Sequence, residues 1–71
     1  MMRIVDKMSP FSVEEGDVIF LEIGELEVVS VDPTNEGYNI LVTDMYLEKL
    51  TMFIKNDELV PVVVGYDELD I

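Results

Sequence analysis

The chain of 71 residues contains no cysteine and no histidine. Without cysteine it can form neither a disulfide nor a thiolate metal centre, so packing alone, or packing shared with a partner, must stabilise the fold. The commonest general base and the strongest thiol nucleophile are missing as well. No glycine-rich phosphate loop or nucleophile-elbow serine is present. We therefore expect a protein that is not an enzyme, with no catalytic residue and no cofactor.

Positive charge is scarce. Four Lys and Arg residues stand against 16 Asp and Glu residues, which gives a formal net charge of −12 at pH 7. Phosphate backbones and anionic membranes repel such a chain, and phosphate contacts need clustered cations. The composition therefore argues against direct binding of nucleic acid or membrane and favours a basic protein partner. Because 49% of the residues are hydrophobic, the chain is not a disordered acidic tail.

Long hydrophobic runs are also missing. The longest apolar runs, Val18–Leu21 and Val60–Val64, are far shorter than a membrane span. Residues 1–10 contain no apolar run of the length found in a signal peptide. Together with the lack of cysteine, these features predict a cytoplasmic protein.

What the chain does contain is runs rich in Val, Ile, Tyr, Phe and Thr, separated by turn residues. After a first short segment at residues 3–8, the runs predict five short strands, at residues 18–23, 26–31, 38–43, 50–55 and 60–64. In the run at residues 38–43, the alternation predicts a half-buried strand with Tyr38, Ile40 and Val42 on one face. Residues 56–59 predict a tight helical turn before the last strand. Pro61 has no amide donor, so we expect that strand to lie at an edge or to change partners there.

Residues 44–54 fit two structures. Tyr46, Leu50 and Phe53 have the spacing of one side of a short helix. The flanks are rich in β-branched and aromatic residues, which favours a hairpin that turns near residues 47–49. We prefer the hairpin, with Leu50, Met52 and Ile54 pointing inward, although no Gly, Asn or Pro marks its turn.

The order of these segments resembles a known fold. The entry sequence VEEGDVIFLEI, the central strand pair at residues 38–55 and the closing sequence NDELVPVV resemble the Src-homology-3-type barrel, in the broad sense that includes KOW and Tudor domains. The resemblance covers residues 13–64. It implies an all-β fold, a small five-stranded SH3-like barrel with a short helical turn before the last strand. We expect one domain over residues 1–65 and a flexible acidic tail over residues 66–71.

The acidic residues are the first candidate binding site. We expect an acidic face that binds a partner and contains Glu14, Glu15, Asp17, Glu22, Glu25, Glu27, Asp57 and Glu58. A spaced array of carboxylates resembles, in composition, that of DNA-mimic proteins, which are often small and viral. The alternative is a solvated face that keeps a hydrophobic small domain soluble.

The tail is the second candidate. It mixes acids with apolar side chains and resembles the protein-docking tails of single-strand DNA-binding proteins; its residues are Tyr66, Asp67, Glu68, Leu69, Asp70 and Ile71. A partner groove with a basic rim and an apolar floor would accept such a segment. The alternative is a frayed terminus without function.

These observations favour a non-catalytic, acidic protein-binding module; one form is a regulator or inhibitor, including a viral one, that docks on a basic surface of a nucleic-acid-binding protein. The alternative is an assembly subunit that associates through an edge strand at Val60–Val64, including as a homo-oligomer. A third hypothesis is a Tudor-like aromatic cage for cationic side chains, built from Phe20, Tyr38, Tyr46, Phe53 and Tyr66. The turn at residues 32–37 offers oxygen atoms but not the ligand spacing of a calcium loop, so we expect no metal site.

Overall fold

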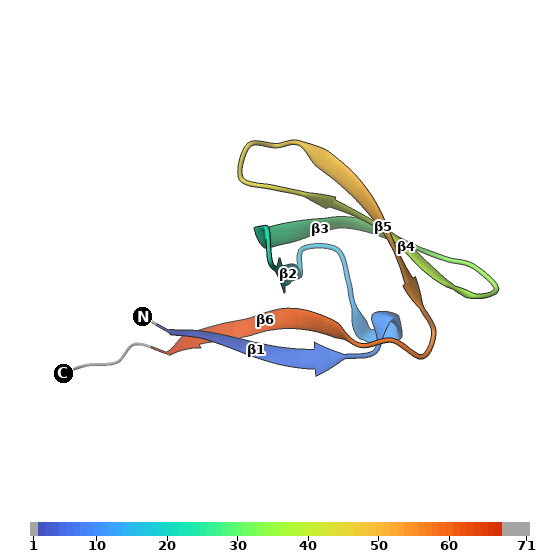
Figure 1. Ribbon diagram of the computed structural model, residues 1–71, viewed down its shortest axis with the longest axis horizontal. Coiled ribbons are helices and arrows are strands. Elements are labelled where there is room, and N and C mark those ends of the chain that lie inside the picture. The colour runs from blue at the N-terminus through green and yellow to red at the C-terminus, as the bar shows by residue number, and fades with distance from the viewer. Residues whose placement is uncertain (1, 68–71) are drawn as a thin grey trace.

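The runs rich in valine, isoleucine and tyrosine form β-strands in the computed structural model, which describes residues 2–67. The elements are β1 (Met2–Met8), the 3-10 turn η1 (Pro10–Ser12), β2 (Val18–Leu21), β3 (Gly24–Pro33), β4 (Gly37–Thr43), β5 (Lys49–Lys55) and β6 (Val60–Asp67) (Figure 1). The predicted all-β fold is confirmed.

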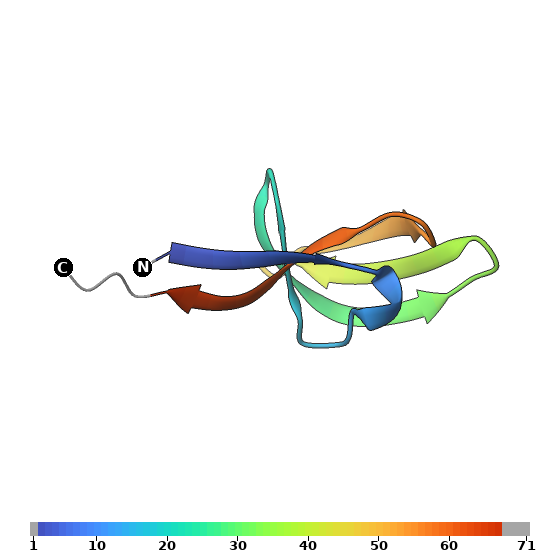
Figure 2. The same ribbon diagram turned by 90° about the horizontal axis from the view of Figure 1, so that it is seen from below.

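All six strands belong to one antiparallel sheet with the order β1-β6-β2-β3-β4-β5. The expected count of five strands is too low, because the segment at residues 3–8 pairs with β6 as an additional strand. The sheet bends, so that the β1–β6 ribbon and the β4–β5 hairpin lie on opposite sides of β2 and β3 (Figures 1 and 2). It does not close into a barrel, since β1 and β5 remain as free edges.

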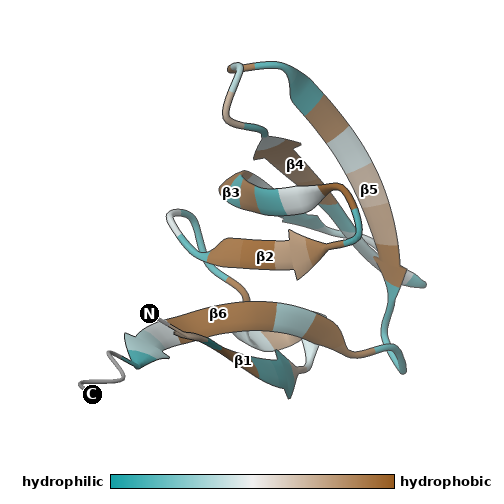
Figure 3. Ribbon diagram, turned by 60° about the vertical axis from the view of Figure 1, so that its left-hand side comes forward, coloured by the Kyte–Doolittle hydropathy of each residue, from teal (hydrophilic) through white to brown (hydrophobic). Residues whose placement is uncertain are grey.

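The core lies on the inner face of the bent sheet. Its buried residues come from the segment before β2 and from β2, β3, β4 and β6; they are Val13, Ile19, Leu26, Val28, Ile40, Val42, Val60 and Val62. The hydrophobic stretches of β2 and β6 lie beside each other in Figure 3. The prediction of one inward face for β4 is confirmed, because Ile40 and Val42 are buried and Tyr38 packs against the core.

The hairpin at residues 44–54 is confirmed, and the helix is not formed. Its turn spans Asp44 to Glu48, slightly earlier than expected. Met52 and Ile54 pack against the core as predicted, whereas Leu50 is 49% exposed. Leu50 lies near the start of an edge strand, where no further strand covers it.

Two other turns differ from expectation. The structure has no helix between β5 and β6; Glu58 N donates to Lys55 O at 3.0 Å and closes a simple turn. In the β2–β3 hairpin, Leu21 pairs with Gly24, so Glu22 and Ile23 form the two-residue turn. Gly24 has φ of 120°, a backbone conformation that glycine adopts readily, and belongs to β3.

The last strand is not an edge. β6 lies between β1 and β2, and its pairing with β2 covers only Val62 and Val63, next to Pro61. The predicted edge at Val60–Val64 is therefore wrong, because β1 covers that side. β6 also continues to Asp67, so Tyr66 and Asp67 belong to the sheet and not to a tail. Glu68, Leu69, Asp70 and Ile71 lie outside the described residues.

Candidate functional site

Most of the predicted acidic residues gather beside the β2–β3 hairpin. The loop before β2 is fixed to β3 by two backbone hydrogen bonds, from Gly16 N to Val28 O at 2.9 Å and from Val28 N to Asp17 O at 2.8 Å. The loop is closed by the Asp17 carboxylate, which accepts from Glu14 N at 2.8 Å. These bonds place the loop next to Glu27 on β3. We call this region, with its neighbours on β3 and β4, the β2–β3 acidic surface; it comprises Glu14, Glu15, Asp17, Glu25, Glu27 and Asp44.

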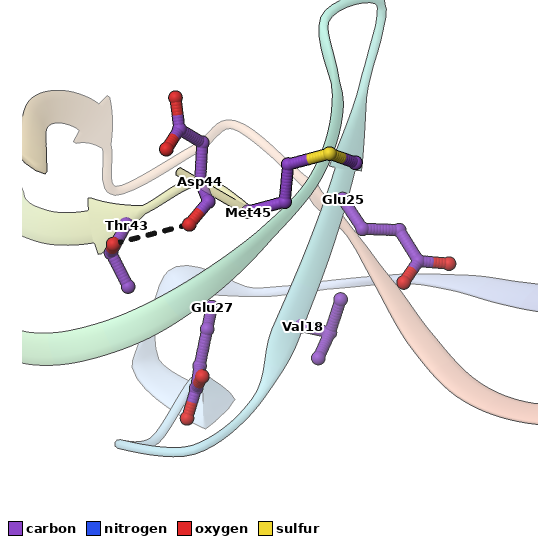
Figure 4. Close-up of a pocket in the computed structure, with 6 residues that line it drawn as sticks. All are labelled: Val18, Glu25, Glu27, Thr43, Asp44 and Met45. Carbon is purple, nitrogen blue, oxygen red and sulfur yellow. Dashed lines mark hydrogen bonds between the residues drawn. The ribbon is translucent and has the colours of Figure 1, made fainter. Parts of the chain in front are cut away.

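A pocket of about 250 Å³ lies within this surface. It is lined by Val18 of β2, Glu25 and Glu27 of β3, Thr43 at the end of β4, and Asp44 and Met45 of the following turn (Figure 4). The three carboxylates point in different directions around the hollow. They do not converge on one point, and residues 2–67 contain no group of three or more acidic side chains that could hold a metal ion.

The pocket combines apolar and anionic groups. Val18 and Met45 offer alkyl surface, and the carboxylates stand at its border. Long cationic side chains bury their aliphatic stems and keep the charged head near water. The lining therefore suits a Lys or Arg side chain better than a metal ion. Asp44 and Met45 are not among the site residues predicted from the sequence. The only signal for them is an Asp at the end of a strand, because the turn that follows contains no Gly or Pro.

The three other predicted acids lie in two turns. Glu22 lies in the β2–β3 turn and so does not share the face of β3 on which the alternate residues Glu25 and Glu27 lie. Asp57 and Glu58 lie in the β5–β6 turn. That turn is bonded to the β3–β4 turn, since Asn56 N donates to Glu36 O at 3.1 Å. It thus belongs to a second acidic group, the turn group, which comprises Asp32, Glu36, Asp57 and Glu58.

Glu25 joins the β1–β6 ribbon to the β2–β3 hairpin. Arg3 Nε donates to its Oε2 at 2.7 Å, and the Tyr66 hydroxyl lies 3.0 Å and 2.9 Å from its two oxygens. The Arg3 guanidinium also lies over the Phe20 ring, 4.0 Å from the centroid. Within residues 2–67 the Arg3–Glu25 contact is the only ion pair, so the other described carboxylates lack a cationic partner.

These contacts shift the pKa values of Glu25 and Tyr66. The hydrogen bond from Arg3, followed by that from Tyr66, lowers the pKa of the Glu25 carboxyl below its ordinary value of 4.5. The hydrogen bond to Glu25 raises the pKa of the Tyr66 hydroxyl above its ordinary value of 10.0. Tyr66, which we expected in a docking tail, instead supports the packing of the ribbon on the hairpin.

The rings proposed for an aromatic cage serve other contacts. Phe20 stacks with Arg3, Tyr66 bonds to Glu25, and Tyr38 packs against the core. Tyr46 and Phe53 are exposed on the β4–β5 hairpin. None of the residues that line the pocket is aromatic. The geometry of residues 2–67 therefore gives the cage hypothesis no support.

No helix in the described part of the chain has the length and hydrophobicity needed to cross a membrane. Comparison with models of protein families, with curated proteins and with solved structures finds no match to this chain.

Proposed function

We propose that the protein is a non-catalytic binding module that docks through the β2–β3 acidic surface onto a basic surface of another protein. The observation that carries the proposal is the pocket whose lining combines the alkyl groups of Val18 and Met45 with the acidic residues Glu25, Glu27 and Asp44. Within residues 2–67 Glu25 is already bonded to Arg3, whereas the Glu27 carboxylate makes no ion pair or hydrogen bond and can meet a cation of the partner. A Lys or Arg of the partner fits this lining by both its stem and its charge. Inhibition of a nucleic-acid-binding protein in the cytoplasm is the concrete form that we favour, because such proteins carry basic surfaces.

The charge of the β2–β3 acidic surface determines what this surface can contribute to binding. Opposite charges raise the rate of encounter and set the orientation of the two proteins. A single exposed ion pair, however, contributes only about 0.2–1 kcal/mol. Several such pairs would act together here, and binding that relies on them must weaken as salt screens the charges.

We also infer that β2 to β6 form a small SH3-like unit to which β1 is added. The pairing of β2 with β6 supports this inference, because it brings the first and last of these five strands together. The sheet remains open between β5 and β6, so the unit is an incomplete barrel.

The alternative, assembly through a sheet edge, has less support. Each free edge carries two cations: Arg3 and Lys7 on β1, Lys49 and Lys55 on β5. If two copies paired symmetrically around Met52, Lys49 of one copy would face Lys55 of the other. Like charges placed directly opposite destabilise a strand pair, and lysines on edges are a common protection against such pairing.

Two variants with equal net charge test the proposal. The first variant replaces three residues of the β2–β3 acidic surface, Glu14, Glu15 and Glu27, by Gln. The second variant replaces three residues of the turn group, Asp32 and Asp57 by Asn and Glu36 by Gln. Each removes three charges, and none of these six side chains makes a hydrogen bond within residues 2–67. Partners captured from lysate by the wild type should leave the first variant at clearly lower salt and behave normally with the second. Equal behaviour of the two variants would contradict a docking site on the β2–β3 acidic surface.

A further inference from the structure

The tip of the β4–β5 hairpin presents three consecutive large apolar side chains to solvent. Met45 is 80% exposed, Tyr46 is 77% exposed and Leu47 is 80% exposed. Burial of such a side chain by a partner is favourable, because it removes apolar surface from water. Single exposed apolar residues are ordinary on a protein surface, whereas a contiguous group of them is a candidate contact site.

The tip is held in a fixed shape by Asp44. Its Oδ1 accepts from Tyr46 N at 2.8 Å and from Glu48 N at 3.0 Å. Its backbone accepts from Leu47 N at 3.0 Å and donates to Glu48 O at 3.1 Å. An apolar group that is already ordered loses less conformational entropy when a partner covers it.

Leu47 adds a second observation. Its φ is 64°, and within residues 2–67 it is the only residue other than glycine with a positive φ. This left-handed conformation is unfavourable for a residue that carries a Cβ atom, and glycine or asparagine adopts it more easily. The Asp44 hydrogen bonds hold the backbone in this conformation, but the exposed Leu47 side chain packs against no core residue. Burial of the leucine by a partner would explain why an apolar side chain stands at this position.

The tip is continuous with the β2–β3 acidic surface. Met45 and Asp44 line the pocket together with Glu27, and Asp44 and Glu48 flank the apolar side chains. Lys49 stands at the base of the turn, but Asp44, Glu48 and the β2–β3 acidic surface outnumber it. The net negative charge disfavours an anionic membrane or a second copy of this chain as the occupant. It favours a protein surface with an apolar depression whose border carries Lys or Arg.

We propose that Met45, Tyr46 and Leu47 form the apolar anchor that inserts into such a depression, while the β2–β3 acidic surface meets the basic border. The inference rests on the proposed function and names the kind of partner surface. The tip supplies affinity that salt does not screen, and the carboxylates supply the part that salt removes.

Photo-crosslinking first identifies the occupant. Tyr46 and, separately, Glu27 and Phe11 are each replaced by p-benzoylphenylalanine in the full chain, which is irradiated in its host cells. Phe11 is the matched control, since it is 78% exposed and lies on η1, which is at the opposite end of the molecule from the tip of the hairpin (Figure 1). We expect position 46 to crosslink to a partner peptide that contains apolar residues next to Lys or Arg, and position 11 not to do so. Crosslinking from position 46 to lipid, to another copy of the chain or to nothing would overturn the proposal.

The crosslinked partner, purified, is then the probe for affinity measurements. Leu47→Asn removes the apolar group and suits the positive φ, so it should bind about tenfold more weakly at low and at high salt, with a melting temperature equal to or above that of the wild type. Phe11→Ser should bind like the wild type. If Leu47→Asn and Tyr46→Ser both bind normally while the Glu14/Glu15/Glu27 variant does not, the anchor is refuted and the acidic docking site stands. If the charge variant also binds normally, both proposals fail.

Discussion

Gly37, the first residue of β4, offers a sharp test of the sheet. A Cβ atom added there would lie 2.8 Å from Lys55 Cα and closer still to the carbonyl oxygen of Ile54. These are backbone atoms of β5, which pairs with Gly37 through Lys55. They cannot rotate away as a side chain would, so Gly37→Ala must push β4 and β5 apart.

The size of the effect follows from the contact. Inserting a group into a packed site costs about 1–3 kcal/mol, and backbone contacts place Gly37→Ala at the upper end of that range. A domain of this length has a free energy of unfolding of only about 4–11 kcal/mol. Since 1 kcal/mol shifts the melting temperature of a small domain by about 4–8 °C, Gly37→Ala should lower it by about 10 °C or more.

Gly65→Ala is the matched control. Gly65 also lies in a strand, β6, but a Cβ there would meet no atom within 4 Å. The same chemical change should therefore leave the melting temperature almost unchanged or raise it slightly, through a smaller unfolded-state entropy. Thermal unfolding followed by circular dichroism measures both variants. Equal melting temperatures for the two would refute the close approach of β4 and β5 at Gly37.

Three further predictions concern charge. The pKa of Glu25 is lower in the folded protein than its ordinary value of 4.5. Its contribution to the free energy of unfolding is therefore fully present above pH 4.5 and is lost as the pH falls through the pKa of the folded state. The stability difference between the wild type and Glu25→Gln should therefore shrink in acid, and a constant difference would show that the Arg3 contact contributes nothing. The pKa of Tyr66 is raised, so its contribution to the free energy of unfolding is fully present below pH 10.0 and is lost as the pH rises through the pKa of the folded state. The stability difference between the wild type and Tyr66→Phe should therefore shrink in alkali. Finally, screening should relieve more repulsion than attraction at a net charge of −12, so the melting temperature should rise with added NaCl; a steady fall would contradict this.

Local patterns were sufficient to predict much of the fold. The alternation of Tyr38, Ile40 and Val42 gave the inward face of β4, because side chains along a strand point to opposite faces in turn. β1 was not predicted as a strand, since its residues are almost all exposed and show no such alternation. It forms by pairing with β6, far away in the sequence, and this pairing also explains why Val60–Val64 is not an edge.

The site was predictable only in composition. The chain is so acidic that candidate residues were easy to name, but their grouping depends on hydrogen bonds between distant segments. The hydrogen bond from Gly16 N to Val28 O places the loop before β2 next to β3. The hydrogen bond from Asn56 N to Glu36 O places Asp57 in the turn group and not in the β2–β3 acidic surface. The apolar tip could not be predicted, because the spacing of Tyr46 also fits a helix. The hydrogen bonds to Asp44 shape the turn, and no Gly or Pro marks that turn in the sequence.

The central claim is that the position of the negative charge, and not its amount, directs binding. The most direct measurement is the salt concentration that releases the captured partner from the two variants of equal net charge. We predict earlier release from the variant altered at Glu14, Glu15 and Glu27, and wild-type release from the variant altered at Asp32, Glu36 and Asp57. Identical release from both would mean that the carboxylates only keep the protein in solution, and would contradict the account.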